Sequence, residues 1–277
     1  MKKAHLLYSM IGIIAFGFSA STKLKMSWST PQALDVPESV LYHTAGDYLF
    51  VSNISGKPAE KNGAGFISRL STDGKIQQLK WVTGLNAPKG MASTEKQLFV
   101  SDIDALVIIN IKQAKIEHRI EMPAAKFLND VTITTDGDVY VSDSGDNRIY
   151  KLEDDKLISW QEGDHLQGVN GLLAENNVLL VGTRNKVLKY NLQTNEYSTF
   201  IDQTCSVDGI EADGRGGYFF SAWRGELYHW TPDSKPTQLL DTADQNINCA
   251  DIGYDTKNNR LLVPTFFNNR VIAYQYN

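Results

Sequence analysis

Four side chains with oxygen donors recur at matching places along this sequence. They are one glutamate, two asparagines and one aspartate, at Glu38, Asn129, Asn170 and Asp208. Each is followed by a small or polar residue and then by an apolar one, as in VNGL and VDGI. Carboxylate and amide oxygens are the ligands that hard divalent cations prefer. If the fold brings these four side chains together, they would bind a single divalent cation.

The same three-residue pattern occurs at two further places, which start at Lys89 and Ala250. Six copies then follow one another at intervals of 51, 40, 41, 38 and 42 residues. A period of about 40 residues is typical of proteins built from like units around an axis. The pattern therefore predicts that the four oxygen-bearing side chains meet where six equivalent units converge.

The chemistry of this ligand set favours calcium. Two carboxylates and two neutral amides balance the charge of a dication, and the lack of His and Cys disfavours zinc or copper. Calcium accepts about seven flexible oxygen ligands, which leaves positions for water or substrate. Mg2+, Mn2+ and, less favourably, Zn2+ are the alternatives. Because Asn and Asp are common turn residues, any one of the four alone would say little.

A cation with an open coordination position would also be a catalyst, since it can polarise a carbonyl or phosphoryl oxygen. Asp208 is then the expected general base or nucleophile, because a carboxylate beside the cation can act on a bound ester. The alternative is that Asp208 is a ligand only.

Short strands are the elements that would position these residues. In the third repeat, FLNDVTI and DVYVSD flank a turn at Asp136-Gly137, and IYKLE and KLISWQEG flank another at Asp154-Asp155. Such turns between β-forming runs indicate antiparallel hairpins. The other repeats follow the same plan without convincing helical periodicity. The prediction is an all-β, six-bladed propeller with four antiparallel strands in each blade.

Closure of this ring needs one strand from elsewhere, because the last repeat contains only three. We expect the segment around Lys25–Leu34 to supply it and so to protect an open edge. The starts of the first strands, with the four ligands, would then share one face with the loops that follow the second strands. The longest of these loops, Asn53–Gly65, is Gly-rich and polar, and would be either a lid or a disordered surface loop.

The first 20 residues have the pattern of a secretory signal peptide. Lys2 and Lys3 precede an apolar run from Leu6 to Phe18, and small residues follow. We therefore expect a signal peptide at 1–20, a propeller domain at 21–277, and a periplasmic or secreted protein without membrane association after cleavage. The alternative is an uncleaved anchor.

Composition limits the partners. The net charge is −5 and there is no basic block, which argues against nucleic-acid binding. No phosphate-binding GxxxxGK[ST] loop is present. We expect a monomer that acts on a small molecule. Cys205 and Cys249 would form either a disulfide, in an oxidising compartment, or two buried free thiols.

The ligand pattern resembles the regucalcin/gluconolactonase family, the senescence marker protein type of six-bladed propeller, over residues 30–277. In that family the catalytic divalent cation is bound by an early Glu, an Asn in an N-D motif, an Asn in an N-G motif and an Asp in a D-G motif. The matching positions are, in the same order, Glu38, Asn129-Asp130, Asn170-Gly171 and Asp208-Gly209. The resemblance implies a metal-dependent lactonase in which Asp208 is the base or nucleophile.

One departure concerns the substrate. Sugar-lactonase members carry an Arg two residues before the Asn-Asp pair, where this chain has Phe127. Phe127, Trp223 and Phe266 would give the pocket an apolar rim that suits a less polar lactone or ester. The alternative is that each belongs to the ordinary packing of a blade. Lys89 lies either in the channel, as a substrate-binding cation or proton donor, or at the surface.

Two functions fit these residues. The first is an exported, divalent-metal-dependent hydrolase of a lactone or related ester, with Lys89, Phe127 and Trp223 at its substrate pocket. The second is a non-catalytic propeller, stabilised by calcium, whose channel face binds a ligand or a protein. They differ in whether the cation has an open coordination position that faces a pocket.

Overall fold

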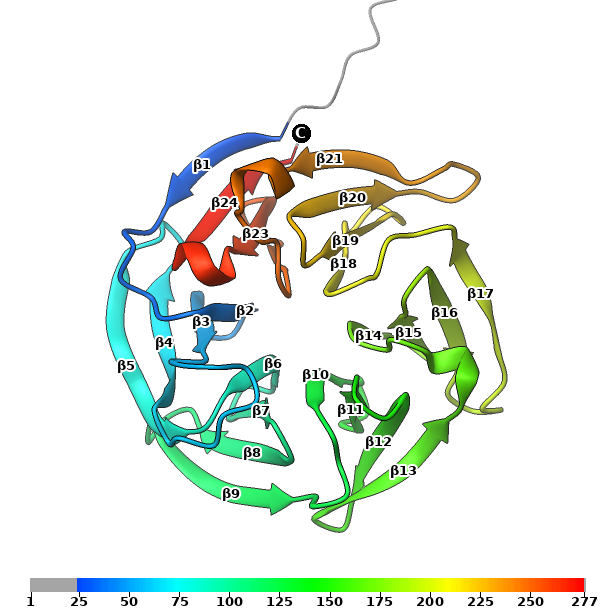
Figure 1. Ribbon diagram of the computed structural model, residues 1–277, viewed down its shortest axis with the longest axis horizontal. Helices are drawn as coiled ribbons and strands as arrows, with labels where there is room; N and C mark the ends of the chain where they lie inside the picture. Colours follow the sequence, from blue (N-terminus) through cyan, green and yellow to red (C-terminus); the bar gives the residue numbers. More distant parts are fainter. Residues whose placement is uncertain (1–23, 277) are drawn as a thin grey trace, which may run out of the picture.

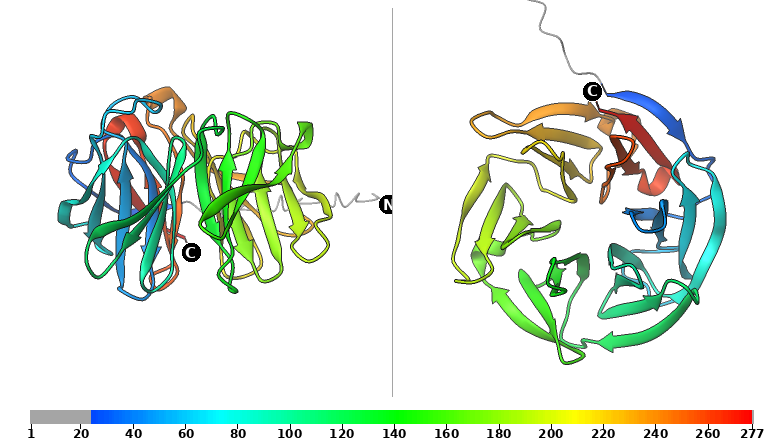
Figure 2. Two further views of the ribbon diagram at one scale, coloured as in Figure 1. Left: turned by 90° about the horizontal axis from the view of Figure 1, so that it is seen from below. Right: turned by 180° about the vertical axis from the view of Figure 1, so that it is seen from behind.

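In the computed structural model, which describes residues 24–276, each repeat folds into a four-stranded antiparallel sheet. The six sheets stand around a central axis as the blades of a propeller (Figure 1). Figure 2 shows their strands running between the two faces of the ring. The predicted all-β, six-bladed architecture is thereby confirmed. The expected signal peptide lies outside the described residues.

The first three blades are regular meanders whose strands follow chain order from the axis outward. Blade 1 contains β2 (Pro37–His43), β3 (Tyr48–Asn53), β4 (Gly65–Ser71) and β5 (Ile76–Leu85). Blade 2 contains β6 (Pro88–Ser93), β7 (Gln97–Asp102), β8 (Ala105–Asn110) and β9 (Lys115–Glu121). Blade 3 contains β10 (Leu128–Ile133), β11 (Val139–Asp143), β12 (Arg148–Glu153) and β13 (Lys156–Glu162).

The next two blades follow the same order. Blade 4 contains β14 (Leu172–Glu175), β15 (Val178–Gly182), β16 (Lys186–Asn191) and β17 (Tyr197–Asp202). Blade 5 contains β18 (Ile210–Ala212), β19 (Tyr218–Ala222), β20 (Glu226–Trp230) and β21 (Thr237–Asp241). The helices of the described chain are three short 3-10 segments, namely η1 (Asp164–Leu166), η2 (Ala243–Gln245) and η3 (Phe266–Asn268).

Blade 6 joins the two ends of the propeller. It contains β22 (Gly253–Asp255), β23 (Arg260–Pro264) and β24 (Val271–Gln275), and β1 (Lys25–Ser29) pairs antiparallel with β24 as its outer strand. The expectation that the segment after residue 24 closes the ring is confirmed, with a strand that ends at Ser29 rather than Leu34. Trp28 anchors β1 to blade 1, because its indole N–H donates to the Thr72 carbonyl at 3.0 Å.

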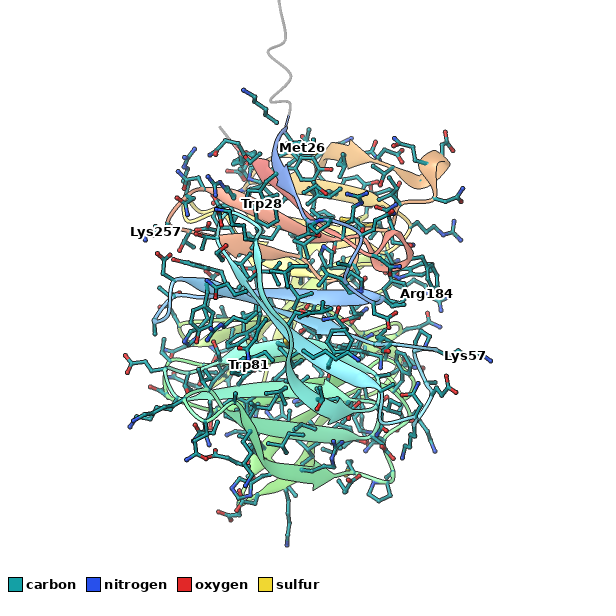
Figure 3. All side chains as sticks on the ribbon, turned by 90° about the vertical axis from the view of Figure 1, so that its left-hand side faces the viewer. Met26, Trp28, Lys57, Trp81, Arg184 and Lys257 are labelled. Atoms are coloured by element: carbon teal, nitrogen blue, oxygen red, sulfur yellow. The ribbon has the colours of Figure 1, made fainter. Side chains whose placement is uncertain are left out.

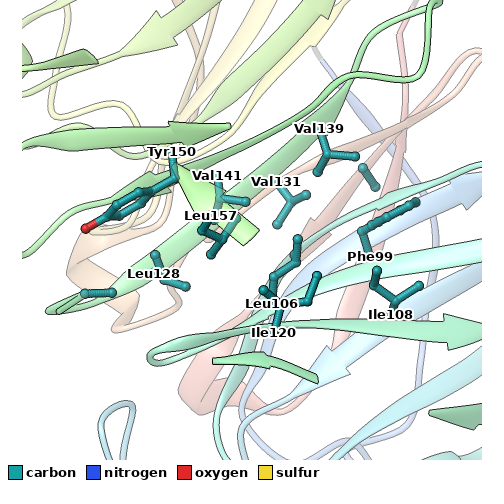
Figure 4. Close-up of a cluster of buried hydrophobic side chains, with 12 residues drawn as sticks. Phe99, Leu106, Ile108, Ile120, Leu128, Val131, Val139, Val141, Tyr150 and Leu157 are labelled. Carbon is teal, nitrogen blue, oxygen red and sulfur yellow. The ribbon is translucent and has the colours of Figure 1, made fainter. Parts of the chain in front are cut away.

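The hydrophobic core is divided among the six junctions between neighbouring blades. Figure 4 shows the cluster between blades 2 and 3, where Phe99 and Leu106 from one sheet pack against Val131 and Val141 from the next. Apolar clusters also fill the other five junctions. Because both faces of each sheet are covered, the inner strands leave only their edges and starting residues for the channel.

The two faces of the ring carry different loops. In Figure 3, Lys57 and Arg184, from the loops after β3 and β15, lie on one side, and Lys257 lies on the other. The loop Asn53–Gly65 is fastened to blade 2, since the Gly63 N–H donates to Asn86 Oδ1 at 3.2 Å and Lys61 pairs with Asp104. None of the helices within residues 24–276 has the length and apolar character needed to span a bilayer.

Candidate metal centre

A β-bulge marks the start of the first strand in the first three blades. The register of β2 with β3 shifts between Pro37 and Val40, and equivalent shifts occur in β6 and β10. Each bulge holds a pair of residues: Glu38-Ser39, Lys89-Gly90 and Asn129-Asp130. Bulges bend a strand and redirect its side chains, so both members of a pair can approach the axis.

Serines on the second strands support this geometry. The backbone N–H of Ser39 donates to Ser52 Oγ at 3.0 Å, and that of Asp130 donates to Ser142 Oγ at 2.9 Å. In blade 5, Ser221 Oγ accepts from the Gly209 N–H at 2.9 Å and donates to the Ala250 carbonyl of blade 6 at 2.8 Å. These serines were missed by the sequence analysis, although their recurrence in YLFVSN, DVYVSD and GYFFSA is a detectable signal.

Glu38 and Asp208 are buried, and one carboxylate oxygen of each, Oε2 and Oδ2, has no hydrogen-bond partner among the described residues. The other Asp208 oxygen, Oδ1, accepts a hydrogen bond from Asn170 Nδ2. Asp208 is held in place by its backbone N–H, which donates to the Ser221 carbonyl at 2.8 Å. Two buried acceptors therefore remain free of protein donors at the channel.

The two asparagines present their oxygens in the same way. Asn129 Nδ2 donates to Ser144 Oγ at 3.2 Å, and Asn170 Nδ2 donates to Asp208. Because each amide nitrogen donates to the protein, the amide oxygens point away from those two acceptors. The structure thus joins Asn170 to Asp208 directly, whereas Asn129 is fastened to its own blade in the equivalent position on β10.

Burial governs the electrostatics of this group. It raises the pKa of Glu38 well above the ordinary value, and the negative charges of Asp208 and Asp251 add to the effect, while Lys89 opposes it. Burial also raises the pKa of Asp208 to about 7, although the hydrogen bond from Asn170 acts in the opposite direction. Both carboxylates are therefore short of positive charge in the protein alone.

A second set of acids lies one residue further along the repeats, at Asp130 and Asp251. Asp130 Oδ2 accepts from the Leu172 N–H of the next blade at 2.6 Å, and Asp251 Oδ2 accepts from Ser39 Oγ at 2.5 Å. Glycines make room for them, because a Cβ on Gly90 would lie 2.3 Å from Asp130 Oδ1, and one on Gly209 would lie 2.5 Å from Asp251 Oδ1. These acids link neighbouring blades around the channel.

Lys89 lies inside the protein with 1% of its surface exposed, so the alternative surface location is wrong. Its Nζ donates to the Ala87 carbonyl at 2.9 Å and lies 4.3 Å from the centre of the half-buried Phe127 ring. Burial lowers the pKa of Lys89 to about 8, while Glu38 and Asp102 act to raise it. One face of Phe127 is therefore occupied by the chain's own cation.

A pocket of about 490 Å³ adjoins Asp208. Its lining includes Asn170, Asp208, Cys205, Trp223 and Arg224. The structure thus places Trp223 beside two of the expected ligands, whereas Phe127 pairs with Lys89 and is absent from this lining. The half-buried Cys205 and the buried Cys249 are free thiols, so the alternative of a disulfide is wrong.

A cavity of about 520 Å³ opens at the other end of the channel. It is lined by Asp130, Glu211, Asp251 and His43, among others. Within residues 24–276, no three His, Cys, Asp or Glu side chains gather closely enough to form a metal site by themselves. Any metal centre here therefore depends on the two amide oxygens as well as on the carboxylates.

Comparison with known proteins shows similarity in structure rather than in sequence. No protein-family model and no curated protein matches the chain. A solved streptogramin B lyase structure superimposes with a TM-score of 0.65 at 13% identity, and covers 92% of this chain and 97% of its own. A catalytically inactive His-to-Ala variant of virginiamycin B lyase from Staphylococcus aureus, with quinupristin, superimposes with a TM-score of 0.63 at 14% identity. This match covers 92% of the present chain and 99% of the lyase. These likenesses establish the propeller fold, and membership of the regucalcin/gluconolactonase family stays a prediction.

Proposed function

We propose that this chain is a hydrolase of lactones or related esters that requires a divalent cation, preferably Ca2+, held by Glu38, Asn129, Asn170 and Asp208. The observation that carries the proposal is that Glu38 Oε2 and Asp208 Oδ2 are buried without a donor among the described residues. Such oxygens are costly to bury, and a hard cation would satisfy both. Mg2+, Mn2+ and Zn2+ are the alternatives.

The balance of charge supports the same conclusion. Burial raises the pKa of five carboxyl groups near the channel, those of Glu38, Asp130, Asp208, Glu211 and Asp251. Within residues 24–276, Lys89 is the one buried Lys or Arg. A dication would offset charge that this ammonium group cannot balance alone.

We assign the action on the substrate to Asp208, because Asn170 binds only its Oδ1, and its Oδ2 has a second lone pair besides the one that would bind the cation. A bound divalent cation would polarise the substrate carbonyl. As a general base, Asp208 would take a proton from water while the water oxygen attacks the carbonyl carbon. As a nucleophile, it would form an acyl-enzyme that water then hydrolyses. In both routes the ester C–O bond breaks and the leaving oxygen gains a proton.

The pocket beside Asp208 favours this enzyme over the non-catalytic, calcium-stabilised propeller, because it gives a small molecule access to the expected ligands. We assign Trp223 to substrate binding there and Lys89 to substrate binding or proton donation. From the N-terminal pattern we place the protein in the periplasm or outside the cell, and we propose that it acts as a monomer.

The names of the structural neighbours raise the question of lyase activity. The virginiamycin B lyase variant among them is catalytically inactive and carries alanine in place of a histidine. In the described part of this chain, none of the histidines lines the pocket that contains Asp208. His43 borders the opposite cavity, and His229 bonds to Asp213 on blade 5. A hydrolase that uses a carboxylate therefore suits these residues better.

The test is hydrolysis of small lactones and aryl esters by the purified protein. Activity would be measured after chelation and again after Ca2+, Mg2+, Mn2+ or Zn2+ is added back. We expect a metal to restore turnover, and Asp208→Asn to reduce it by at least about a hundredfold while calorimetry still detects metal binding. Asp146→Asn is the matched control, because Asp146 is a carboxylate on the same face that pairs with Arg148.

Two outcomes would count against the proposal. Full activity in Asp208→Asn would remove Asp208 from the mechanism. If no metal restores turnover of any ester while calcium still raises the melting temperature, the non-catalytic propeller is the better description.

A further inference from the structure

Three aromatic side chains pack together beside the Asp208 pocket, and we name them the aromatic ridge. They are Trp223, which follows β19, and Phe266 and Phe267 of η3 in the neighbouring blade 6. The ring centres lie 5.5 Å apart for Trp223 and Phe266, 6.1 Å for Trp223 and Phe267, and 4.8 Å for Phe266 and Phe267. In each pair the two ring planes are nearly perpendicular. Edge-to-face contacts of this kind stabilise aromatic clusters.

The ridge combines a buried base with an exposed top. Phe266 is buried, whereas 43% of Trp223 and 61% of Phe267 remain exposed to solvent. Among the large exposed apolar side chains within residues 24–276, Trp223 lines the pocket beside Asp208 and Phe267 packs against Trp223, whereas Met26, Leu79, Ile158 and Tyr197 do neither. Exposed apolar groups that cluster at a pocket mark a binding surface more strongly than scattered ones.

The backbone holds the ridge in place. Phe266 has a φ of +47°, which is unfavourable for a bulky residue and is typically retained at functional positions. On the other side, the Trp223 carbonyl accepts hydrogen bonds from the Cys249 N–H at 3.3 Å and from Asn248 Nδ2 at 3.0 Å. A platform fixed in this way loses little conformational entropy when a ligand binds.

The ridge is continuous with the proposed reaction site. Trp223 lines the same pocket as Asp208 and Asn170, together with the apolar side chain of Val207. The lining of that pocket also contains the polar side chains of Ser206, Arg224 and Glu226, so apolar contact with a ligand there depends mainly on the ridge. A substituent on a carbonyl beside Asp208 would be within reach of Trp223, and Phe267 packs against Trp223.

From this arrangement we propose that the aromatic ridge binds an apolar substituent of the substrate. The preferred substrate is then a lactone or ester with an alkyl chain or ring next to the ester group, not a polyhydroxylated sugar lactone. This inference rests on the proposed function, and it adds Phe267 to the residues that determine specificity.

The experiment compares δ-valerolactone with a δ-lactone that carries a five-carbon chain beside the ring oxygen. The ratio of their kcat/KM values would be measured for the metal-loaded wild type and for Phe267→Ala and Trp223→Ala. Since each buried methylene contributes about fourfold, we expect the wild type to prefer the alkyl lactone by tenfold or more. Each ridge variant should reduce that ratio by about three- to tenfold.

Tyr197→Ala is the matched control. Tyr197 is an aromatic residue of similar exposure on the outer strand β17, away from the pocket, and its removal should leave the ratio unchanged. A ratio that stays at the wild-type value in both ridge variants would overturn the inference. A preference for glucono-δ-lactone over the alkyl lactone would do the same.

A binding measurement separates failure of this inference from failure of the proposed hydrolase. The alkyl δ-lactam is a probe with an amide in place of the ester, and its binding is followed by tryptophan fluorescence. If the lactam binds and the ridge variants weaken its binding, but no ester is hydrolysed, the role of the ridge is supported and the proposed hydrolase activity is overturned. If esters are hydrolysed but the ridge variants bind the lactam as tightly as the wild type, only the inference about the ridge is overturned. Dimers that light scattering detects in the wild type but not in the ridge variants, without lactam binding, would identify the ridge as a protein interface. This result would also overturn the inference that the ridge binds substrate.

Discussion

At the scale of single residues, the proposed centre depends on oxygens that the protein leaves without donors. Serine, amide and backbone groups around the channel satisfy Ser39, Asp130 and Asp251, yet Glu38 Oε2 and Asp208 Oδ2 stay free within the described structure. A cation site requires oxygens without hydrogen-bond donors, because one lone pair cannot both accept a hydrogen bond and bind a metal.

Replacing Glu38 by Gln tests this arrangement with two readouts of opposite sign. The change removes a charge that lies buried near Asp208 and Asp251, so the chelated protein should become more stable, by about 1 kcal/mol or more. The same change removes a ligand, so calcium affinity should fall by at least about tenfold, or ~1.4 kcal/mol. Thermal unfolding with a chelator and calorimetry with calcium measure the two effects.

The opposite signs separate a ligand from a structural residue. If Glu38 only stabilised the fold, the chelated Glu38→Gln protein would melt earlier and calcium affinity would be unaltered. Earlier melting with unaltered calcium affinity would exclude Glu38 from the ligand set. Glu95→Gln is the control, since Glu95 is an exposed carboxylate at the cavity on the other end of the channel.

The positions of the expected ligands followed from the repeat, but their surroundings did not. The interval of about 40 residues aligned Glu38, Asn129 and Asp208 without knowledge of the fold. The contact of Lys89 with Phe127 and the fit of Asp130 against Gly90 join residues about 40 apart in sequence, across a blade junction. No local pattern specifies such a contact, because it depends on how two sheets pack.

At the scale of elements, β1 closes the ring by pairing with one strand and by a side-chain contact with another blade. Its backbone pairs with β24, and Trp28 packs over the β4–β5 turn of blade 1, where a Cβ on Gly74 would lie 2.5 Å from the indole ring. Arg260 Nη1 of blade 6 donates to the same Thr72 carbonyl that accepts from Trp28, at 3.0 Å. This single turn therefore connects the first blade with the closing strand.

Gly74→Ala should weaken the closure, and Gly137→Ala provides a matched control. Both glycines follow an Asp in a hairpin turn and have positive φ, +84° and +93°, so both variants pay about 1 kcal/mol for backbone strain. A Cβ at Gly137 has no atom within 4 Å, whereas one at Gly74 displaces Trp28. We expect Gly74→Ala to be less stable than Gly137→Ala by about 1–3 kcal/mol in urea unfolding.

Equal losses in the two variants would contradict the anchoring role of Trp28. A second comparison then applies, because Gly74→Ala in a Trp28→Ala background should cost no more than Gly137→Ala. Such a double-mutant cycle isolates the contact between the two residues.

The strands themselves were largely predictable, because β-forming runs separated by polar turn residues recur in every repeat. The turn at Asp154-Asp155 has both residues at positive φ, +46° and +58°, as a two-residue hairpin requires. The bulges at Glu38, Lys89 and Asn129 were not predicted. A bulge adds one residue without changing composition, so only the pairing of the strands reveals it.

At the scale of the whole molecule, the expected ligands come from four of the six blades. Glu38 belongs to blade 1, Asn129 to blade 3, Asn170 to blade 4 and Asp208 to blade 5. A cation bound by all four would connect parts of the ring that share no hydrophobic cluster, such as blades 1 and 4. Its binding energy would then stabilise the ring as one unit.

We therefore expect calcium to shift the unfolding of the entire propeller. At a free concentration of 100 times Kd, it should add about 2.7 kcal/mol to the free energy of unfolding. For a chain of this size, that corresponds to an increase in Tm of roughly 5 °C, and a chelator should reverse it. The unfolding curves from far-UV and near-UV circular dichroism should each show a single transition, and calcium should shift both by the same amount.

The joint shift of the two signals distinguishes a cation that stabilises the whole ring from one that stabilises a separately unfolding part. A cation bound at a loop that unfolds on its own would shift only the local part of the unfolding curve, because the remaining blades would gain nothing from it. Two separate transitions, with calcium moving one of them, would therefore exclude a centre that joins blades 1, 3, 4 and 5. A single transition that calcium moves in the wild type but not in Glu38→Gln would support the axial location, because Glu38 belongs to a different blade from the other three ligands.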